Sequence, residues 1–155
     1  MLDNFLCAMD IPPEVRIPLC IEQGSIFNFY IDFDGPKRQS KNRYFVVLNR
    51  DPKTDVALIM VTSTTQTTKK REFVKRVGIS EKTIVTVLPR EYSVFTKESA
   101  FDCNEIFEIN MQDLIRKIEE NGSMNYRKMP DKILAKIING VKESPRVSSG
   151  IKKLL

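Results

Sequence analysis

Hydrophobic residues in the first two thirds of the chain recur with the spacing of short β-strands. Phenylalanine and isoleucine alternate with polar or amphipathic residues over 27–33, a period of two that is typical of a strand with one face in a core. Two apolar runs, 44–48 and 56–61, flank the turn-forming segment 49–55 and predict a hairpin. Further short strands are predicted at 83–88, 100–103 and 105–109. Such short strands between turn signals predict a mainly β, α+β fold built on a small barrel or sandwich.

The last third of the chain changes to helical spacing. Asn110 is a predicted N-cap, the apolar residues after it share one face, and Asn121-Gly122 predicts the end of that helix. A second apolar stripe over 133–141 follows Pro130 and ends before Ser144-Pro145. Near the N-terminus, residues 3–9 predict a short helix, and the prolines after it predict an extended or turn stretch.

These patterns predict a single domain over residues 1–155. Its parts are an N-terminal extension at 1–23, a β-barrel core at 24–109, C-terminal helices at 110–143 and a frayed polar tail at 144–155.

The absence of histidine excludes several classes of site. The chain has 155 residues and no histidine, which removes Cys₂His₂ and His₃ zinc sites, Ser-His-Asp and Cys-His catalysis, and a histidine acid–base pair. Cys7, Cys20 and Cys103 are far apart and form no CxxC motif. We therefore expect small buried cysteines in a reducing cytoplasm, with no disulfide framework, no metal site and no cofactor.

The net charge and the hydropathy of the chain exclude few classes of binding partner. There are 25 Lys and Arg residues against 20 Asp and Glu residues, a net charge of +5, which allows a nucleic-acid partner without requiring one. No apolar stretch approaches the roughly 18 residues that a membrane-spanning helix needs. The first ten residues lack the basic region of a signal peptide. We expect a soluble, cytoplasmic protein with no membrane partner.

Basic residues gather in and after the loop that precedes the second predicted strand. Between residues 35 and 53 the only acidic residue is Asp51. The basic residues there are Lys37, Arg38, Lys41, Arg43, Arg50 and Lys53. Such a segment can attract phosphate groups, and arginine can donate two hydrogen bonds to one phosphate. On charge alone, a solvated loop is an equally good interpretation.

Candidate chemistry sits at the ends of the predicted strands. Arg43 directly precedes one strand, and Thr62 and Ser63 directly follow the next. Hydroxyl groups in such places can bind phosphate or ribose, although threonine is also simply common in strands and turns. Of the aromatic residues nearby, only Tyr30, Tyr44 and Tyr92 are reasonable outward candidates for stacking on bases, which contributes about 1–3 kcal/mol per base.

Taken in order, these segments resemble the MazF/PemK family of toxin ribonucleases, whose SH3-like barrel is shared with the CcdB toxins. The family has a strand after a glycine, an Arg-Pro strand, a strand ending in Ile-Thr, a Leu-x-x-x-Ser segment, a late strand and a helix. The similar segments here are 24–33, 43–48, 59–63, 95–99, 101–109 and 129–142. Each motif is unspecific, and it is their order and spacing that carry the resemblance.

The resemblance implies a metal-independent endoribonuclease that cleaves single-stranded RNA and acts as the toxin of a type II toxin–antitoxin system. The ribose 2′-OH attacks the adjacent phosphate and leaves a 2′,3′-cyclic phosphate. By the resemblance, Arg43 and Thr62 form the catalytic centre: Arg43 stabilises charge on the pentacoordinate phosphate, and Thr62 positions or donates to a phosphate oxygen. An antitoxin partner and a homodimer are implied as well. The RNA-binding residues expected around this centre are Lys37, Arg38, Lys41, Tyr44 and Ser63.

Two departures from the family pattern keep an alternative open. Tyr44 stands where the family has a proline, and the loop 35–42 lacks the glutamate that some relatives carry as a candidate base. A base would have to come from Asp32, from Asp34 or from elsewhere, and Tyr44 or Lys41 would need a strongly lowered pKa to serve. The alternative is a non-catalytic SH3-like barrel that binds nucleic acid or a protein partner.

Overall fold

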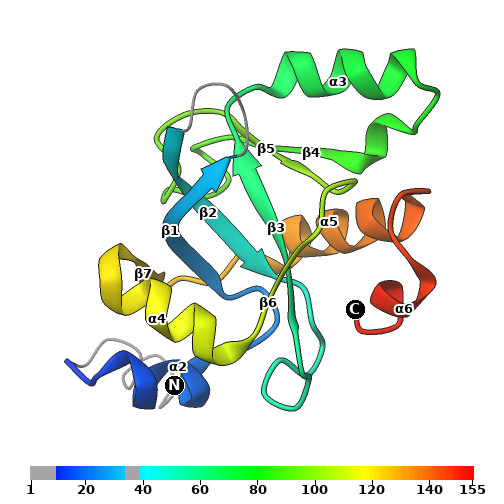
Figure 1. Ribbon diagram of the computed structural model, residues 1–155. Coiled ribbons are helices and arrows are strands. Elements are labelled where there is room, and N and C mark those ends of the chain that lie inside the picture. The colour runs from blue at the N-terminus through cyan, green and yellow to red at the C-terminus, as the bar shows by residue number, and fades with distance from the viewer. Residues whose placement is uncertain (1–9, 34–38) are drawn as a thin grey trace.

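The computed structural model describes residues 10–33 and 39–155 (Figure 1). Its strands are β1 (Ile26–Phe33), β2 (Gln39–Val47), β3 (Leu58–Thr64), β4 (Ile84–Val87), β5 (Ser99–Asp102), β6 (Phe107–Ile109) and β7 (Ser123–Asn125). Its helices are α2 (Pro13–Cys20), α3 (Thr67–Arg76), α4 (Met111–Asn121), α5 (Asp131–Glu143) and α6 (Ser149–Lys152), with the short 3₁₀-helix η1 (Glu81–Thr83).

The strands form one seven-stranded antiparallel sheet in the order β4-β5-β3-β2-β1-β7, with β6 also paired to β3. The sheet divides at β3, which pairs with β6 through Leu58–Met60 and with β5 through Ser63 and Thr64. The predicted mainly β, α+β fold class is confirmed. Among the described residues the sheet does not close on itself, because β4 and β7 end it without pairing.

Two hydrophobic cores lie on opposite faces of the sheet. Alternation along β3 sends Ile59 and Val61 into the larger core and Leu58 and Met60 into the smaller one. Helix α5 lies on the face of the larger core, and α2 with α4 lies on the other face (Figure 1). The larger core contains residues of β1, β2, β3, β4 and β5 together with the apolar face of α5, so α5 covers this face of the sheet.

The helices predicted for the last third of the chain are confirmed. The side chain of Asn110 caps α4 by accepting a hydrogen bond from the backbone N–H of Asp113 at 2.8 Å, and Gly122 ends the helix. Pro130 is the N-cap of α5, whose last residue is Glu143. The apolar stripe of α5 packs into the larger core as Ile133, Leu134, Ile137 and Val141.

Of the local predictions, one fails and one lies outside the described residues, and two observed elements were not predicted. Helix α2 stands where an extended stretch was predicted, because Pro13 begins a helix whose Ile17 is buried in the smaller core. Helix α3 and strand β7 were not predicted. The predicted helix at 3–9 falls outside the described residues.

The C-terminal tail is ordered rather than frayed. Leu155 is 3% exposed and packs into the larger core. The backbone N–H of Arg50 donates to Leu154 O at 2.8 Å, and Arg50 Nη2 donates to Leu155 O at 2.6 Å. These bonds join the tail to the turn between β2 and β3, a contact between distant segments that composition could not predict.

The cysteine prediction is confirmed for one cysteine and wrong for another. Cys103 is free and buried, whereas Cys20 is disulfide-bonded. Among the helices of the described residues, none combines the length and apolar character needed to cross a membrane.

Candidate active site

The register of the sheet places the two predicted catalytic residues on one face. Arg43 lies opposite Phe29, and Phe45, two residues further along β2, lies opposite Thr62 of β3. Alternate residues of a strand share a face. Arg43, Phe45 and Thr62 therefore lie on the same side of the sheet, where β2 and β3 meet.

Both side chains are held against the backbone at this junction. Arg43 Nη1 donates a hydrogen bond to Ser63 O at 2.8 Å. Thr62 Oγ1 donates to Tyr44 O at 3.2 Å and lies 3.5 Å from the same Ser63 O. The guanidinium and the hydroxyl, 19 positions apart in the chain, are thus gathered around one carbonyl oxygen.

Arg43 is half-buried, and this burial lowers the pKa of its guanidinium. An arginine keeps its positive charge at neutral pH nevertheless, because its ordinary pKa exceeds 12. The hydrogen bond to Ser63 O fixes the direction of the planar group, which carries five N–H donors. Charge held in one place and partly shielded from water acts on a ligand more strongly than a solvated loop charge does.

A groove of about 470 Å³ opens beside this junction; we call it the Arg43 groove. It is lined by Lys41, Asn42, Arg43, Tyr44, Ser63, Thr64, Thr65, Gln66, Val94, Phe95, Thr96, Lys97 and Ser99. Among these described residues three are cationic, five carry an aliphatic hydroxyl and none is acidic. Within residues 10–33 and 39–155, no group of three or more cysteine, aspartate or glutamate side chains could hold a metal ion.

An aromatic wall borders the groove. The ring of Tyr44 meets Phe95 edge-on with centroids 5.2 Å apart, and Phe95 meets Tyr92 in the same way. Tyr92 belongs to the larger core, where burial raises the pKa of its hydroxyl well above the usual range and the hydroxyl donates to Arg127 O at 2.6 Å. Tyr44 is therefore the tyrosine that the groove exposes, and Tyr92 is a core residue.

The remaining predicted site residues divide into three groups. Lys41 and Ser63 line the groove together with Tyr44, although Ser63 is only 6% exposed. Lys37 and Arg38 fall outside the described residues. Thr62 lies beside the groove but is not among its lining residues, and its hydroxyl is engaged with the backbone of β2.

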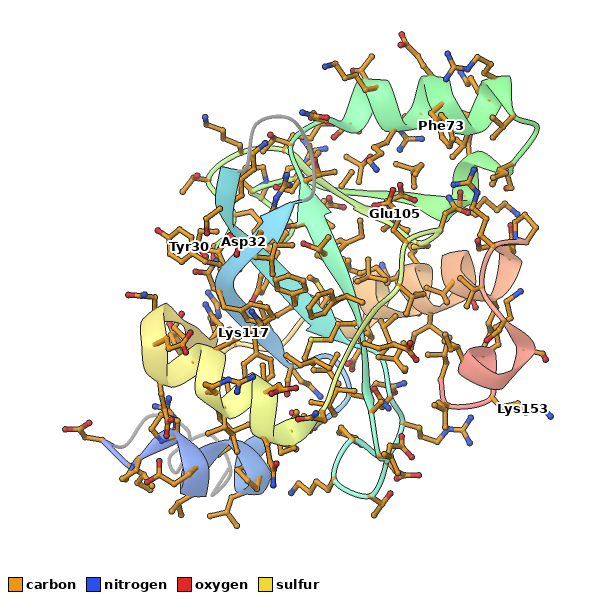
Figure 2. All side chains as sticks on the ribbon, in the orientation of Figure 1. Tyr30, Asp32, Phe73, Glu105, Lys117 and Lys153 are labelled. Atoms are coloured by element: carbon orange, nitrogen blue, oxygen red, sulfur yellow. The ribbon has the colours of Figure 1, made fainter. Side chains whose placement is uncertain are left out.

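The candidate bases are dispersed. Asp32 lies on the exposed side of β1 with Tyr30 (Figure 2), opposite Ser40, and does not line the Arg43 groove. Asp34 is outside the described residues. Besides Arg43, the titratable groups that line the groove in the described part of the chain are Lys41, Tyr44 and Lys97.

Lys97 is the functional candidate that the sequence analysis missed. It comes from the segment between β4 and β5, far from the basic loop in sequence, and lines the groove together with Lys41. The segment 95–99 was part of the family resemblance. The resemblance therefore indicated that the segment belongs near the site, but it assigned no role to Lys97.

Comparison with known proteins supports the architecture at the level of fold. No family model matches the sequence, and no curated protein matches it significantly. A chain of the crystal structure of MazE-MazF (Form-III) from Deinococcus radiodurans aligns with a TM-score of 0.52 at 10% identity, covering 83% of this chain and 98% of that chain. A chain of the Form-II structure aligns with a TM-score of 0.51 at 9% identity, covering 78% and 91%. The chain therefore has the MazF-like fold that its sequence resemblance implied.

Proposed function

We propose that this protein is a metal-independent endoribonuclease that cleaves single-stranded RNA. The observation that supports the proposal is Arg43, anchored on Ser63 O at the edge of a groove with cationic and hydroxyl-bearing residues and no described acidic one. RNA carries a negative phosphate at every nucleotide, and protein contacts to phosphate come mainly from Arg, Lys, Ser and Thr side chains. The half-buried ring of Tyr44, which lines the groove, offers a surface on which a base can stack.

In the proposed reaction, the ribose 2′-oxygen forms a bond to the adjacent phosphorus and the bond from phosphorus to the 5′-oxygen breaks. The products are a 2′,3′-cyclic phosphate and a 5′-hydroxyl. Arg43 stabilises the negative charge that grows on the phosphate oxygens, an effect that contributes about 10²–10³-fold for a single well-placed donor. Thr62 takes part by turning its hydroxyl from Tyr44 O toward a phosphate oxygen, so the hydrogen bond to Tyr44 O must break when RNA binds.

The reaction also needs a group that accepts the 2′-OH proton and one that protonates the leaving 5′-oxygen. Lys41, Tyr44 and Lys97 are the titratable partners of Arg43 in the lining of the groove. We propose that these roles fall within this set. Substituting each of the three singly and recording the pH dependence of cleavage would identify the residue.

We further propose that the protein is the toxin of a type II toxin–antitoxin pair, with an antitoxin protein as its partner, and that it works as a cytoplasmic homodimer. The MazF-like fold supports this extension of the proposal, since the similar chains come from MazE-MazF structures. Sedimentation of the purified chain would measure the oligomeric state, and coexpression with the neighbouring gene product would test the partner.

The decisive experiment is RNA cleavage in the presence of EDTA. Purified protein is incubated with a long single-stranded RNA, and the product ends are mapped. We expect defined cuts that leave 2′,3′-cyclic phosphate ends, and their loss in Arg43→Ala. Arg90→Ala is a matched control, because Arg90 is exposed and does not line the groove. Absence of cleavage, or cleavage unchanged in Arg43→Ala, would contradict the proposal.

A second candidate is a non-catalytic protein that binds RNA or a protein partner through the same groove. Two observations favour it: no described carboxylate lines the groove, and the Thr62 hydroxyl is engaged with backbone. Salt-dependent RNA binding without product formation would support this candidate. Indifference to RNA would direct attention to a protein target.

A further inference from the structure

The last strand at the other end of the sheet has an open edge. Strand β4 pairs with β5 from Ile84 to Val87, and no described strand pairs with its other side. The free edge of a strand presents unpaired backbone N–H and C=O groups, and folded proteins normally cover or interrupt such edges. This edge therefore calls for a partner or a cover.

Helices flank β4 on both faces but leave its edge open. Ile84 packs with Val74 of α3 in a small third cluster, and Arg71 of α3 donates to Thr86 Oγ1 at 2.7 Å. Val85 and Val87 face the larger core, to which α5 belongs. In Figure 1, α3 lies above β4 and α5 below it, and Figure 2 places Phe73 on α3.

A groove of about 770 Å³ runs along this open edge; we call it the β4 groove. Its floor contains three consecutive strand residues, Ile84, Val85 and Thr86, and its walls come from α3, η1 and α5. Consecutive residues of a strand point to opposite faces. A groove that contacts three of them in a row, together with helices from both faces, must follow the edge of the strand.

The charges around the β4 groove are unbalanced toward positive. Its two acidic residues are already paired: Glu81 with Lys75 at 3.4 Å and Glu143 with Lys82 at 3.9 Å. Lys136 and Lys142 on α5 also line the groove and are exposed, and neither has an ion-pair partner among the described residues. A ligand here meets two ammonium groups without local counter-charges.

We propose that the β4 groove binds an extended, acidic segment of a partner polypeptide, which adds one strand to the sheet. The backbone of the segment pairs with the free edge of β4, the main source of affinity in this mode of recognition. Alternate side chains point toward α5 and toward α3. Carboxylates on the α5 side meet Lys136 and Lys142, and short side chains such as valine on the α3 side lie beside Thr86 and the aliphatic part of Arg71.

The same features disfavour the two other occupants of such an edge. A second copy pairing β4 with β4 would bring two sets of Lys136 and Lys142 close to one another, and like charges so placed repel. A nucleic acid has no regular backbone donors and acceptors to pair with a strand and would leave the edge of β4 unpaired. The proposal is independent of the proposed ribonuclease function, because it concerns a different groove.

The test uses the full chain and a fluorescein-labelled octapeptide in which glutamate and valine alternate. Fluorescence anisotropy measures binding, and hydrogen–deuterium exchange measures protection of the β4 amides. We expect saturable binding, slower exchange at Val85 to Val87, and at least a tenfold loss of affinity in Lys136→Glu/Lys142→Glu. Lys132→Glu/Lys153→Glu makes the same change of charge at exposed positions outside the groove and should bind as the parent does.

A second peptide separates strand pairing from simple charge attraction. N-methylation at alternate residues keeps the side chains and the charge but removes backbone donors, so this peptide should bind at least tenfold more weakly. Equal binding of the two peptides, no binding of either, or protection confined to the Arg43 groove would overturn the proposal. Two further results would also overturn it: loss of single-stranded RNA binding in Lys136→Glu/Lys142→Glu, or a dimer that the peptide dissociates. Thermal unfolding of each variant confirms that it is folded.

Discussion

The two grooves of this protein both attract negative charge, but they are built from different chemical groups. The Arg43 groove presents three cationic side chains, several hydroxyl groups and an aromatic ring, with no acidic residue among its described lining. The β4 groove mixes four cationic side chains with two acidic ones along a mainly apolar strand whose outer edge no other described strand pairs with. Charge alone would have assigned both to one kind of ligand.

The difference lies in what surrounds the charge. Hydroxyl groups can bind phosphates, and an aromatic ring that lines a groove can stack on bases. A free strand edge instead presents regularly spaced backbone donors and acceptors, which another extended backbone can pair with. The location also differs, since the first groove lies where the middle of β2 meets the end of β3 and the second follows the outermost strand. Five changes would break or sharpen this comparison.

The largest effect is expected for Arg43→Lys. Lysine keeps the positive charge but loses the planar group that is anchored on Ser63 O. RNA cleavage should fall by about 10²–10³-fold, while binding of the glutamate-valine peptide stays unchanged. The rate of RNA cleavage in EDTA tests the first expectation, and the fluorescence anisotropy of the labelled peptide, measured on the same preparation, tests the second. A parallel loss of peptide binding would show that the grooves are coupled.

Asn104→Ala should weaken the support of the β4 groove. Asn104 Nδ2 donates to Thr83 Oγ1 at 2.9 Å, and Ser144 Oγ donates to Asn104 Oδ1 at 2.6 Å, which joins the end of α5 to the strands. Thr83 and Ser144 are fully buried, so their loss of a partner should cost about 2–3 kcal/mol of unfolding free energy. Urea unfolding measures the cost, and Asn139→Ala, at an exposed position, should change it little.

Gly140→Ala should separate α5 from the segments that it packs on. An added Cβ would lie 2.8 Å from Cys103 Sγ and 2.8 Å from Lys82 O, which is too close for van der Waals contact. We expect a loss of about 1–3 kcal/mol in unfolding free energy and weaker peptide binding. Gly150→Ala is the control, because an added Cβ there would meet only Ser148 Oγ, at an ordinary contact distance of 3.9 Å, and helix α6 should gain from alanine. Equal stability of the two variants would contradict the packing argument.

Alkaline pH should destabilise the α5 side of the molecule through Cys103. Burial raises the pKa of its thiol to about 12, compared with about 8.5 in an unfolded chain. The folded protein therefore holds the proton more tightly, and this stability is fully present below about pH 8.5 and falls as the pH rises, by about 1.4 kcal/mol per pH unit. Urea unfolding at pH 8, 9 and 10 should show a steeper decline of the unfolding free energy with pH in the parent than in Cys103→Ala. Equal slopes in the two proteins would contradict this role of the Cys103 thiol.

The smallest effect is expected for Lys41→Gln/Lys97→Gln. Each lysine that neutralises an RNA phosphate contributes about 0.7 to the slope of log affinity against log salt for a single strand. The slope should therefore decrease by about 1.4. Binding of the glutamate-valine peptide should not change, because neither lysine lines the β4 groove. An unchanged salt slope would place the RNA elsewhere on the surface.

Much of the fold follows from local pattern. Alternation over 27–33 predicted β1, and the apolar stripe over 133–141 predicted α5, because burial of one face imposes a period on the sequence. The N-cap of α4 was readable from Asn110 for a similarly local reason. The failures, α2, α3 and the C-terminal tail, lie where the local signal is proline, threonine or charge and the decisive contacts are distant.

The candidate site was only partly readable in the same way. Arg43 and Thr62 were identified by a resemblance spread over the chain, and the register of β1, β2 and β3 brings both to one face. The position of Lys97 in the groove depends on where the segment between β4 and β5 lies relative to β2 and β3, which no local pattern specifies. Tyr44 and Tyr92 differ for the same reason. Both are tyrosines near strands, and only the packing of distant segments buries Tyr92 in the larger core while Tyr44 lines the groove.

By itself, the sequence determined the β-rich class, the helical end of the chain and a chemistry without histidine, since period, capping and composition are properties of neighbouring residues. Only the tertiary structure decided that α5 covers the larger core and that, within residues 10–33 and 39–155, the sheet stays open and β4 keeps a free edge between two helices. These features depend on which distant segments pair, and a strand carries no local mark of whether its outer edge will find a partner.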